Sequence, residues 1–163
     1  MIRKQPPAPA LDRIDVALIG LLQNDARRSN KELAAAVGLA PSTCLERVRR
    51  LHDAGVITGS SVTVAPRAVG VGLEAMIRIR LRRTRQGALQ SVLDVLLAHR
   101  EVVAVHHLSG LDDLLVQVAV RDADHLRDVA LEVVGDHPEV GDVQTSLIFE
   151  SWRGRPLPVY ADD

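Results

Sequence analysis

The chain has 163 residues, of which 47% are apolar, so it is long enough for one large or two small domains with hydrophobic cores. Its single cysteine, Cys44, excludes an internal disulfide and a cysteine-based zinc site. No apolar run approaches the ~18 residues of a membrane span and no signal peptide is visible, so we expect a cytoplasmic protein without a membrane partner.

The net charge of −1 hides an uneven distribution. Residues 1–66 carry 9 Lys and Arg against 6 Asp and Glu, whereas residues 67–163 carry 11 against 15. A basic front half and an acidic back half are typical of a DNA-binding domain joined to a second domain.

The chain begins with an arm and a first helix. Residues 1–10 contain three prolines and no periodicity, which predicts a mobile arm. Asp12 can then cap a helix that ends near Asn24 and whose apolar stripe is made by Ile14, Ala17, Leu18, Leu21 and Leu22.

Residues 29–55 predict two further helices joined by a tight turn. Leu33, Ala34 and Val37 share one face of the first, and Gly38 ends it where the backbone needs positive φ. Pro41 opens the second, since a missing N–H costs nothing at a helix start. Its apolar face is Leu45, Val48 and Leu51, which leaves free Thr43, Glu46, Arg47, Arg49 and Arg50.

This arrangement predicts a helix-turn-helix whose free face enters a DNA major groove. The alternative is an ordinary helical hairpin with a solvated basic face. Residues 56–64 favour DNA binding, because they have the pattern of a small hairpin, the wing of a winged helix. We therefore expect a winged helix-turn-helix domain over residues 11–65, followed by a Pro- and Gly-rich linker at 66–72.

Beyond the linker the hydrophobic period changes from helical to two. Residues 73–83 alternate as a strand, residues 86–99 have a helical pattern, and residues 102–109 and 114–120 form two strands around a turn at Gly110. A helix capped by Asp122 or Asp124 and a strand at 143–150 follow. The order β-α-β-β-α-β predicts an α+β, ferredoxin-like domain over residues 73–151, with an irregular tail at 152–163. Because both helices cover one sheet face, a second subunit would cover the other.

The whole pattern resembles the Lrp/AsnC, or feast/famine, transcriptional regulators of bacteria and archaea. The resemblance runs from Leu11 to Glu150. It is carried by Leu11-Asp12 with Asp15, residues 30–34, Gly38-Leu39, Pro41-Ser42, Arg47-Val48, Arg50-Leu51, residues 55–57, residues 109–115 and Thr145. It implies a sequence-specific regulator of double-stranded DNA that forms a homodimer through its second domains, and often a homo-octamer.

The candidate DNA-binding residues lie on the second helix of the motif. Arg47 and Arg50 are the first candidates, because arginine gives bidentate contacts to guanine or pairs with phosphate. Ser42 and Thr43 can reach phosphate or a base edge from the helix N-terminus, and Arg49 can reach phosphate. Glu46 stands where the family often has a basic residue, and Ala40 replaces the usual N-cap serine.

The resemblance also implies a small effector, commonly an amino acid, held between subunits near residues 110–113, with no other cofactor. Backbone N–H groups near Gly110 can take a carboxylate, and Asp113 can take an ammonium. Without the resemblance, Gly110 would only make the hairpin turn and Asp113 would only cap it. The candidate effector residues are His107, Ser109, Gly110, Leu111, Asp112, Asp113 and Thr145; Leu111 and Asp112 depart from the family's polar-aromatic pair.

Other classes fit less well. No acid, base and nucleophile set converges, so we predict no enzyme. The adjacent His106 and His107 point to opposite faces of a strand, so we expect no metal site. An RNA-binding module of the same topology would stack bases on aromatic side chains, and the predicted strands hold only Phe149. An architectural DNA-binding protein without a ligand stays open as the alternative function.

Overall fold

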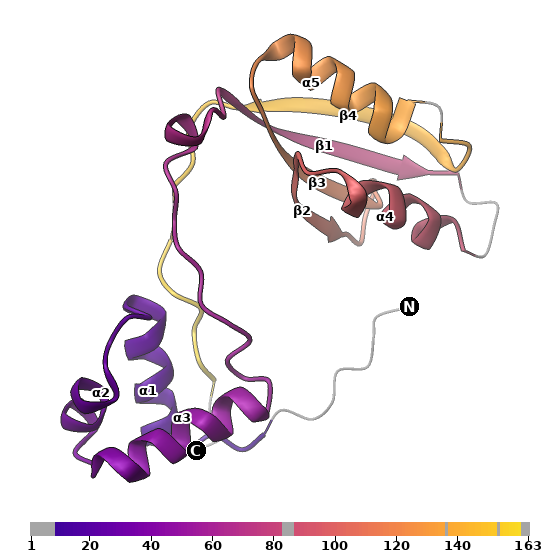
Figure 1. Ribbon diagram of the computed structural model, residues 1–163. Helices are drawn as coiled ribbons and strands as arrows, with labels where there is room; N and C mark the ends of the chain where they lie inside the picture. The colour runs from indigo at the N-terminus through magenta and orange to yellow at the C-terminus, as the bar shows by residue number, and fades with distance from the viewer. Residues whose placement is uncertain (1–8, 83–86, 136, 153, 161–163) are drawn as a thin grey trace. The chain divides into compact units, whose positions relative to one another are not determined.

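A computed structural model describes residues 9–82, 87–135, 137–152 and 154–160 (Figure 1). These residues divide into two compact units. One holds residues 9–63 together with residues 154–160, and the other holds residues 64–152. None of the described helices is long and apolar enough to span a bilayer. Most of the predicted N-terminal arm lies outside the described residues.

The first unit contains the three predicted helices, α1 (Arg13–Asn24), α2 (Asn30–Val37) and α3 (Pro41–Asp53). Asp12 caps α1 and forms a capping box with Asp15, and Ser29 does the same for α2 with Glu32. Gly38 ends α2 with φ of 69°, the left-handed conformation that glycine adopts without strain. The helix-turn-helix prediction is therefore confirmed.

The core of this unit is small and is buried by one face of each helix. Its buried members are Leu18, Ile19, Leu33, Ala34, Cys44 and Leu51. One predicted core residue of α3 is wrong, since Leu45 is 58% exposed and the fully buried side chain of that turn is the neighbouring Cys44. Burial raises the pKa of the Cys44 thiol, which favours its protonated form.

The predicted wing is wrong. No strand forms between Val56 and Ala65. The N–H groups of Val56 and Ile57 instead donate to the carbonyl of Leu51, at 2.9 and 3.1 Å, and so close the C-terminal end of α3. Because both N–H groups donate to the end of α3, they are not available for pairing with a second strand, and the predicted hairpin does not form.

The second unit has the predicted βαββαβ order. It contains β1 (Leu73–Leu81), α4 (Ala88–Ala98), β2 (Val102–His107), β3 (Leu114–Val120), α5 (Ala123–Ala130) and β4 (Val140–Ile148). A short 3₁₀ helix, η1 (Pro66–Val69), precedes β1, and a π turn, η2 (Leu131–Gly135), extends α5. The sheet is antiparallel in the order β2-β3-β1-β4, which confirms the ferredoxin-like fold.

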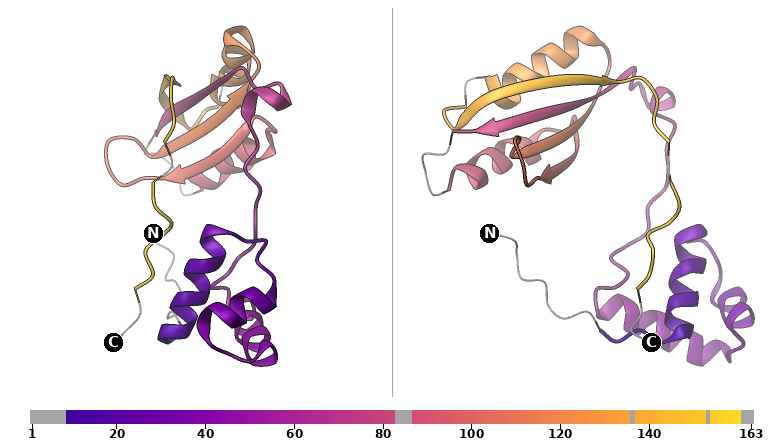
Figure 2. Two further views of the ribbon diagram at one scale, coloured as in Figure 1. Left: turned by 90° about the vertical axis from the view of Figure 1, so that its left-hand side faces the viewer. Right: turned by 180° about the vertical axis from the view of Figure 1, so that it is seen from behind.

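Helices α4 and α5 cover one face of this sheet (Figures 1 and 2). Ile77, Ile79 and Val116 of the sheet are fully buried against Val92 and Leu96 of α4. Within the described residues of this unit, the other face has no helix on it and carries both polar side chains, such as Arg78 and Gln117, and apolar ones, such as Met76 and Leu115. The sequence analysis placed β4 three residues late at its start, because Val140 is buried in the sheet while Gly141 and Asp142 interrupt the apolar pattern.

The aromatic residues have an unusual placement. The chain has one Phe, one Trp and one Tyr, and all three follow β4. Phe149, Trp152 and Tyr160 are 91%, 81% and 88% exposed. No aromatic side chain therefore contributes to either core.

Candidate DNA-binding and effector sites

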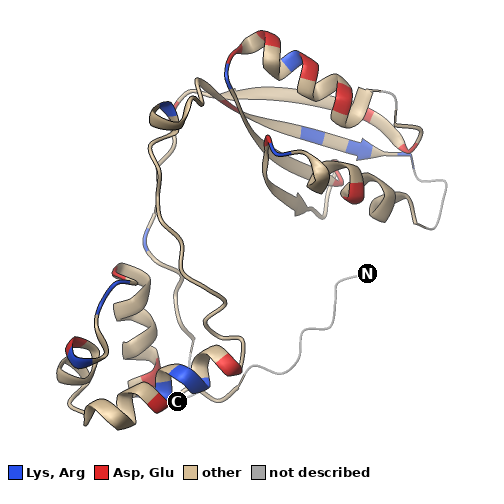
Figure 3. Cartoon of the chain, in the orientation of Figure 1, with Lys and Arg blue, Asp and Glu red and all other residues tan. Residues whose placement is uncertain are grey.

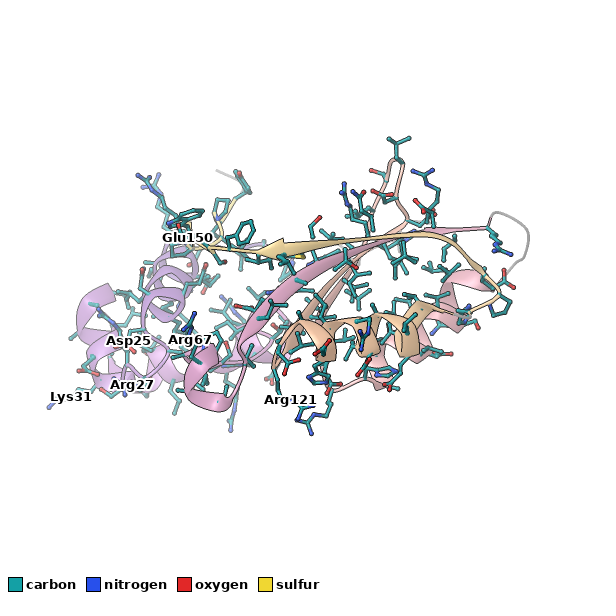
Figure 4. All side chains as sticks on the ribbon, turned by 90° about the horizontal axis from the view of Figure 1, so that it is seen from above. Asp25, Arg27, Lys31, Arg67, Arg121 and Glu150 are labelled. Atoms are coloured by element: carbon teal, nitrogen blue, oxygen red, sulfur yellow. The ribbon has the colours of Figure 1, made fainter. Side chains whose placement is uncertain are left out.

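Helix α3 presents most of the predicted DNA-binding residues to solvent. Ser42 and Thr43 lie in its first turn, and Glu46 and Arg49 follow on the exposed side. Figure 3, in which Lys and Arg positions are blue, shows a blue stretch along the middle of this helix. Two more cations of the unit, Arg27 and Lys31, come from the turn before α2 and its first turn (Figure 4).

Arg47 and Arg50 have contacts that the sequence analysis did not foresee. Both reach back to α1, where the side chain of Asp15 is fully buried. Arg47 Nη1 donates to Asp12 Oδ2 at 2.6 Å and to Asp15 Oδ1 at 3.0 Å, and Arg50 Nη2 donates to Asp15 Oδ2 at 2.6 Å. We call this network of Asp12, Asp15, Arg47 and Arg50 the α1–α3 clamp.

The two arginines of the clamp differ in how much of each side chain is exposed. The Arg47 side chain is 24% exposed, whereas that of Arg50 is 58% exposed and has donors left over. Hydrogen bonds from the Asp15 N–H and from Arg47 hold the pKa of Asp12 below its ordinary value, and the hydrogen bond to Asp12 raises the pKa of Arg47. Arg47 thus carries a structural role in addition to its predicted place at the DNA.

The predicted effector turn is fastened to the end of β1. Arg80 Nε donates to the Leu111 carbonyl at 2.8 Å, and its Nη2 lies 3.7 Å from Asp112 Oδ1. Asp113 contributes two further bonds, from its N–H to the Ile79 carbonyl at 2.9 Å and from the Leu81 N–H to its Oδ2 at 2.8 Å. Four contacts therefore hold the turn against the end of β1.

This fastening leaves donors free at the tip of the turn. Within the described chain, the N–H groups of residues 109–112 have no hydrogen-bond acceptor. Gly110 has φ of 143°, which other residues rarely adopt. Successive unpaired N–H groups in such a loop can bind an anion such as a carboxylate.

The remaining two predicted effector residues lie on strands, His107 at the end of β2 and Thr145 in β4. His107 pairs with buried Leu114, and Thr145 pairs with buried Ile77, so both side chains point to the helix-covered face. Arg80 lies on the opposite face. Within one chain, the structure therefore brings together residues 109–113 but not His107 and Thr145.

Sequence analysis missed Asp15 and Arg80 as site residues. Asp15 carried a signal, because it stands three residues after an N-cap, where a capping-box acid is expected. Arg80 carried no such signal, since its partner Leu111 lies 31 positions away in the sequence.

Comparison with known proteins agrees with both units. Residues 11–52 match the AsnC-type helix-turn-helix domain, and residues 74–157 match the Lrp/AsnC ligand binding domain. The transcriptional regulator AldR of Mycobacterium tuberculosis is 44% identical over 88% of this chain and 80% of its own length. The leucine-responsive regulatory protein of Escherichia coli is 34% identical over 90% of each chain.

Solved structures show the same architecture. A Neisseria meningitidis transcriptional regulator in complex with L-methionine superposes with a TM-score of 0.83, at 30% identity, over 91% of this chain and 96% of that one. Both domains and their order are shared. The chain therefore belongs to the Lrp/AsnC family, and it is a transcriptional regulator rather than an enzyme, with a DNA-binding helix-turn-helix domain and a ligand-binding domain.

Proposed function

We propose that this regulator binds a specific sequence of double-stranded DNA through α3 and that an amino acid bound at residues 109–113 controls it. The effector carboxylate accepts hydrogen bonds from the free N–H groups of the turn, and the Asp113 carboxylate faces its ammonium. We place the protein in the cytoplasm, as a homodimer joined through the sheet face that no helix covers, with a homo-octamer as a further assembly.

The observation that carries the effector proposal is the pre-formed turn with its unpaired N–H groups. A rigid site binds without an ordering cost, which favours a small ligand. The Neisseria relative binds L-methionine, and the Escherichia relative is named for its response to leucine. Both are amino acids, which supports the same ligand class here.

In this proposal, His107 and Thr145 contribute to the effector site only when the chain forms a dimer. Both point away from Arg80 within one chain, so they would complete the site from a second subunit or not at all. An effector held between subunits links occupancy to assembly, because each ligand then contacts two chains.

On the DNA side we propose that Ser42, Thr43 and Arg49 contact the backbone and that Arg50 contacts a base. Arg50 keeps free donors while it holds Asp15, so the clamp fixes its direction before DNA arrives. Glu46 lies on the same exposed surface and can accept from cytosine N4. Arg47 supports this surface and approaches DNA with the donors that the clamp leaves.

Thermal unfolding of the full chain against each of the twenty amino acids tests the effector proposal. A ligand that binds only the folded state adds RT ln(1 + [L]/Kd), about 2.7 kcal/mol at a hundred times Kd, so the correct amino acid raises the midpoint. Asp113→Asn is the matched control, because it keeps an acceptor for the Leu81 N–H and removes the charge that faces the ammonium. The variant should fold normally and lose the rise.

The same experiment separates the two candidate functions. If no amino acid raises the midpoint while the protein still shifts its DNA, the ligand-independent architectural role replaces the sensor. A rise that survives in Asp113→Asn would move the ligand away from residues 109–113.

A further inference from the structure

The C-terminal segment (residues 154–160) follows the ligand-binding domain in sequence but packs with the DNA-binding domain. It belongs to the same compact unit as residues 9–63. Figure 2 shows its last residues beside α1. The DNA-binding domain is thus built from two stretches of sequence, with the ligand-binding domain between them.

Two contacts hold the C-terminal segment on this domain. Val159 is partly buried and packs against the cluster that contains Leu18 and Leu33. At the C-terminal end of α1, Gln23 Nε2 donates to the Leu157 carbonyl at 3.2 Å, and the two residues are 134 positions apart in the sequence. Leu157 also lines a groove of ≈ 540 Å³ together with Ile19 and Leu22.

The composition of the C-terminal segment suits docking at low cost. Prolines at 156 and 158 flank Leu157, and each fixes its own φ and biases the residue before it toward extended backbone. A segment that is already extended loses little conformational entropy when it binds. Proline also has no N–H, so this stretch has more hydrogen-bond acceptors than donors, and the Gln23 amide donates to one of them, the carbonyl of Leu157.

We propose that the C-terminal segment is a strap that docks on α1 and gives the DNA-binding domain a second attachment to the ligand-binding domain. The first attachment is the chain through residues 58–72, and the second is the chain that follows β4 from residue 149 and precedes the docked segment in sequence. Two attachments restrict rotation of one domain against the other more than a single linker does. The inference goes beyond the proposed function and holds whatever the effector is.

Hydrogen exchange of the full chain tests the docking. Val159→Asp places a charge against the core of the DNA-binding domain, and a stop codon at position 153 removes the segment. Both should speed exchange of the α1 amides, on the order of fivefold for the loss of a half-buried valine. Tyr160→Ser is the matched control, since Tyr160 is 88% exposed and its loss should leave α1 unchanged. Protection of β1 and β3 shows that the ligand-binding domain stays folded.

Distances between spin labels test the strap. Labels at Ala36→Cys on α2 and Asp124→Cys on α5 report the two domains, and Cys44 is buried and stays unlabelled. Diluting labelled protein with unlabelled chains isolates the distance within one subunit. We expect a broader distribution in Val159→Asp than in Tyr160→Ser. Unchanged α1 exchange in the truncated chain, or a distribution no broader than in the full chain, overturns the proposal.

Discussion

The side chain of Asp15 is the only charged one that is buried among the described residues, and it joins two helices with different tasks. A buried carboxylate without partners costs several kcal/mol, so its arginines are needed for the fold. They come from α3, the helix that we propose contacts DNA. At this position the folding of the domain and the direction of the DNA-binding side chains depend on the same contacts.

Replacing Arg47 should therefore affect more than DNA binding. Arg47→Ala removes one of the two arginines on Asp15, and we expect the DNA-binding domain to lose about 1–3 kcal/mol of stability in chemical denaturation. Arg49→Ala is the control, because Arg49 is exposed and lies outside the clamp. It should weaken DNA binding in a gel-shift titration without changing the denaturation midpoint. Equal stability of the two variants would show that the clamp adds nothing to the fold.

The clamp also shows what a sequence can predict about single residues. The positions of Arg47 and Arg50 on α3 followed from helical period and charge. Their partner did not, because Asp15 lies 32 and 35 residues away and only the packing angle of the helices brings it close. Asp113 is a second example, since its bond to the Leu81 N–H depends on strand pairing.

At the scale of the elements, the start of α3 differs from those of α1 and α2. Both other helices have a capping box, whereas Ala40 provides no side-chain acceptor to α3. Because Pro41 has no N–H, the N–H groups of Ser42 and Thr43 are the two in its first turn that are left to solvent or to a bound anion. A DNA phosphate at this end would supply the missing acceptor.

Restoring the cap tests this view. Ala40 has the extended backbone of an N-cap, with φ of −66° and ψ of 144°, so Ala40→Ser should form the bond without strain. We expect a gain of about 1 kcal/mol in the free energy of unfolding, measured by urea denaturation. Ser29→Ala, which removes the cap of α2, should cost a similar amount. A neutral Ala40→Ser would mean that the first turn of α3 is already satisfied.

The order of the helices and strands was the feature best predicted from the sequence. Helices and strands carried clear periods, and glycine and proline marked their ends. The wing failed because a run of β-branched residues, Val56-Ile57, was read by composition, while the carbonyl of Leu51 captured both N–H groups. Hydrogen bonds at a helix end are decided by local geometry that an apolar pattern does not encode.

At the scale of the whole molecule, the described residues of the second unit leave one face of their own sheet without a covering layer. Alternate residues of β1 and β3 line it, among them Met76, Leu115 and Gln117. An uncovered sheet that includes apolar side chains gains from a second layer. We infer that a second copy of the chain supplies it.

Light scattering after gel filtration checks the assembly. Leu115→Glu places a charge in the middle of the uncovered face and should shift the dimer to monomer, since a buried unpaired charge costs several kcal/mol. Leu131→Glu is the control, because Leu131 is 62% exposed near the end of α5. Its mass should match that of the unchanged chain. A monomeric Leu131→Glu with a dimeric Leu115→Glu would place the interface on the helical side.

The placement of the aromatic residues has an optical consequence. The only indole of the chain, at Trp152, stands between β4 and the C-terminal segment, and it is 81% exposed. Intrinsic tryptophan emission of this protein therefore comes from one position, in the stretch of chain that follows β4 and precedes the C-terminal segment. A blue shift of the emission, or a loss of iodide quenching, on adding DNA or an amino acid would show directly that Trp152 has become less exposed, without a label.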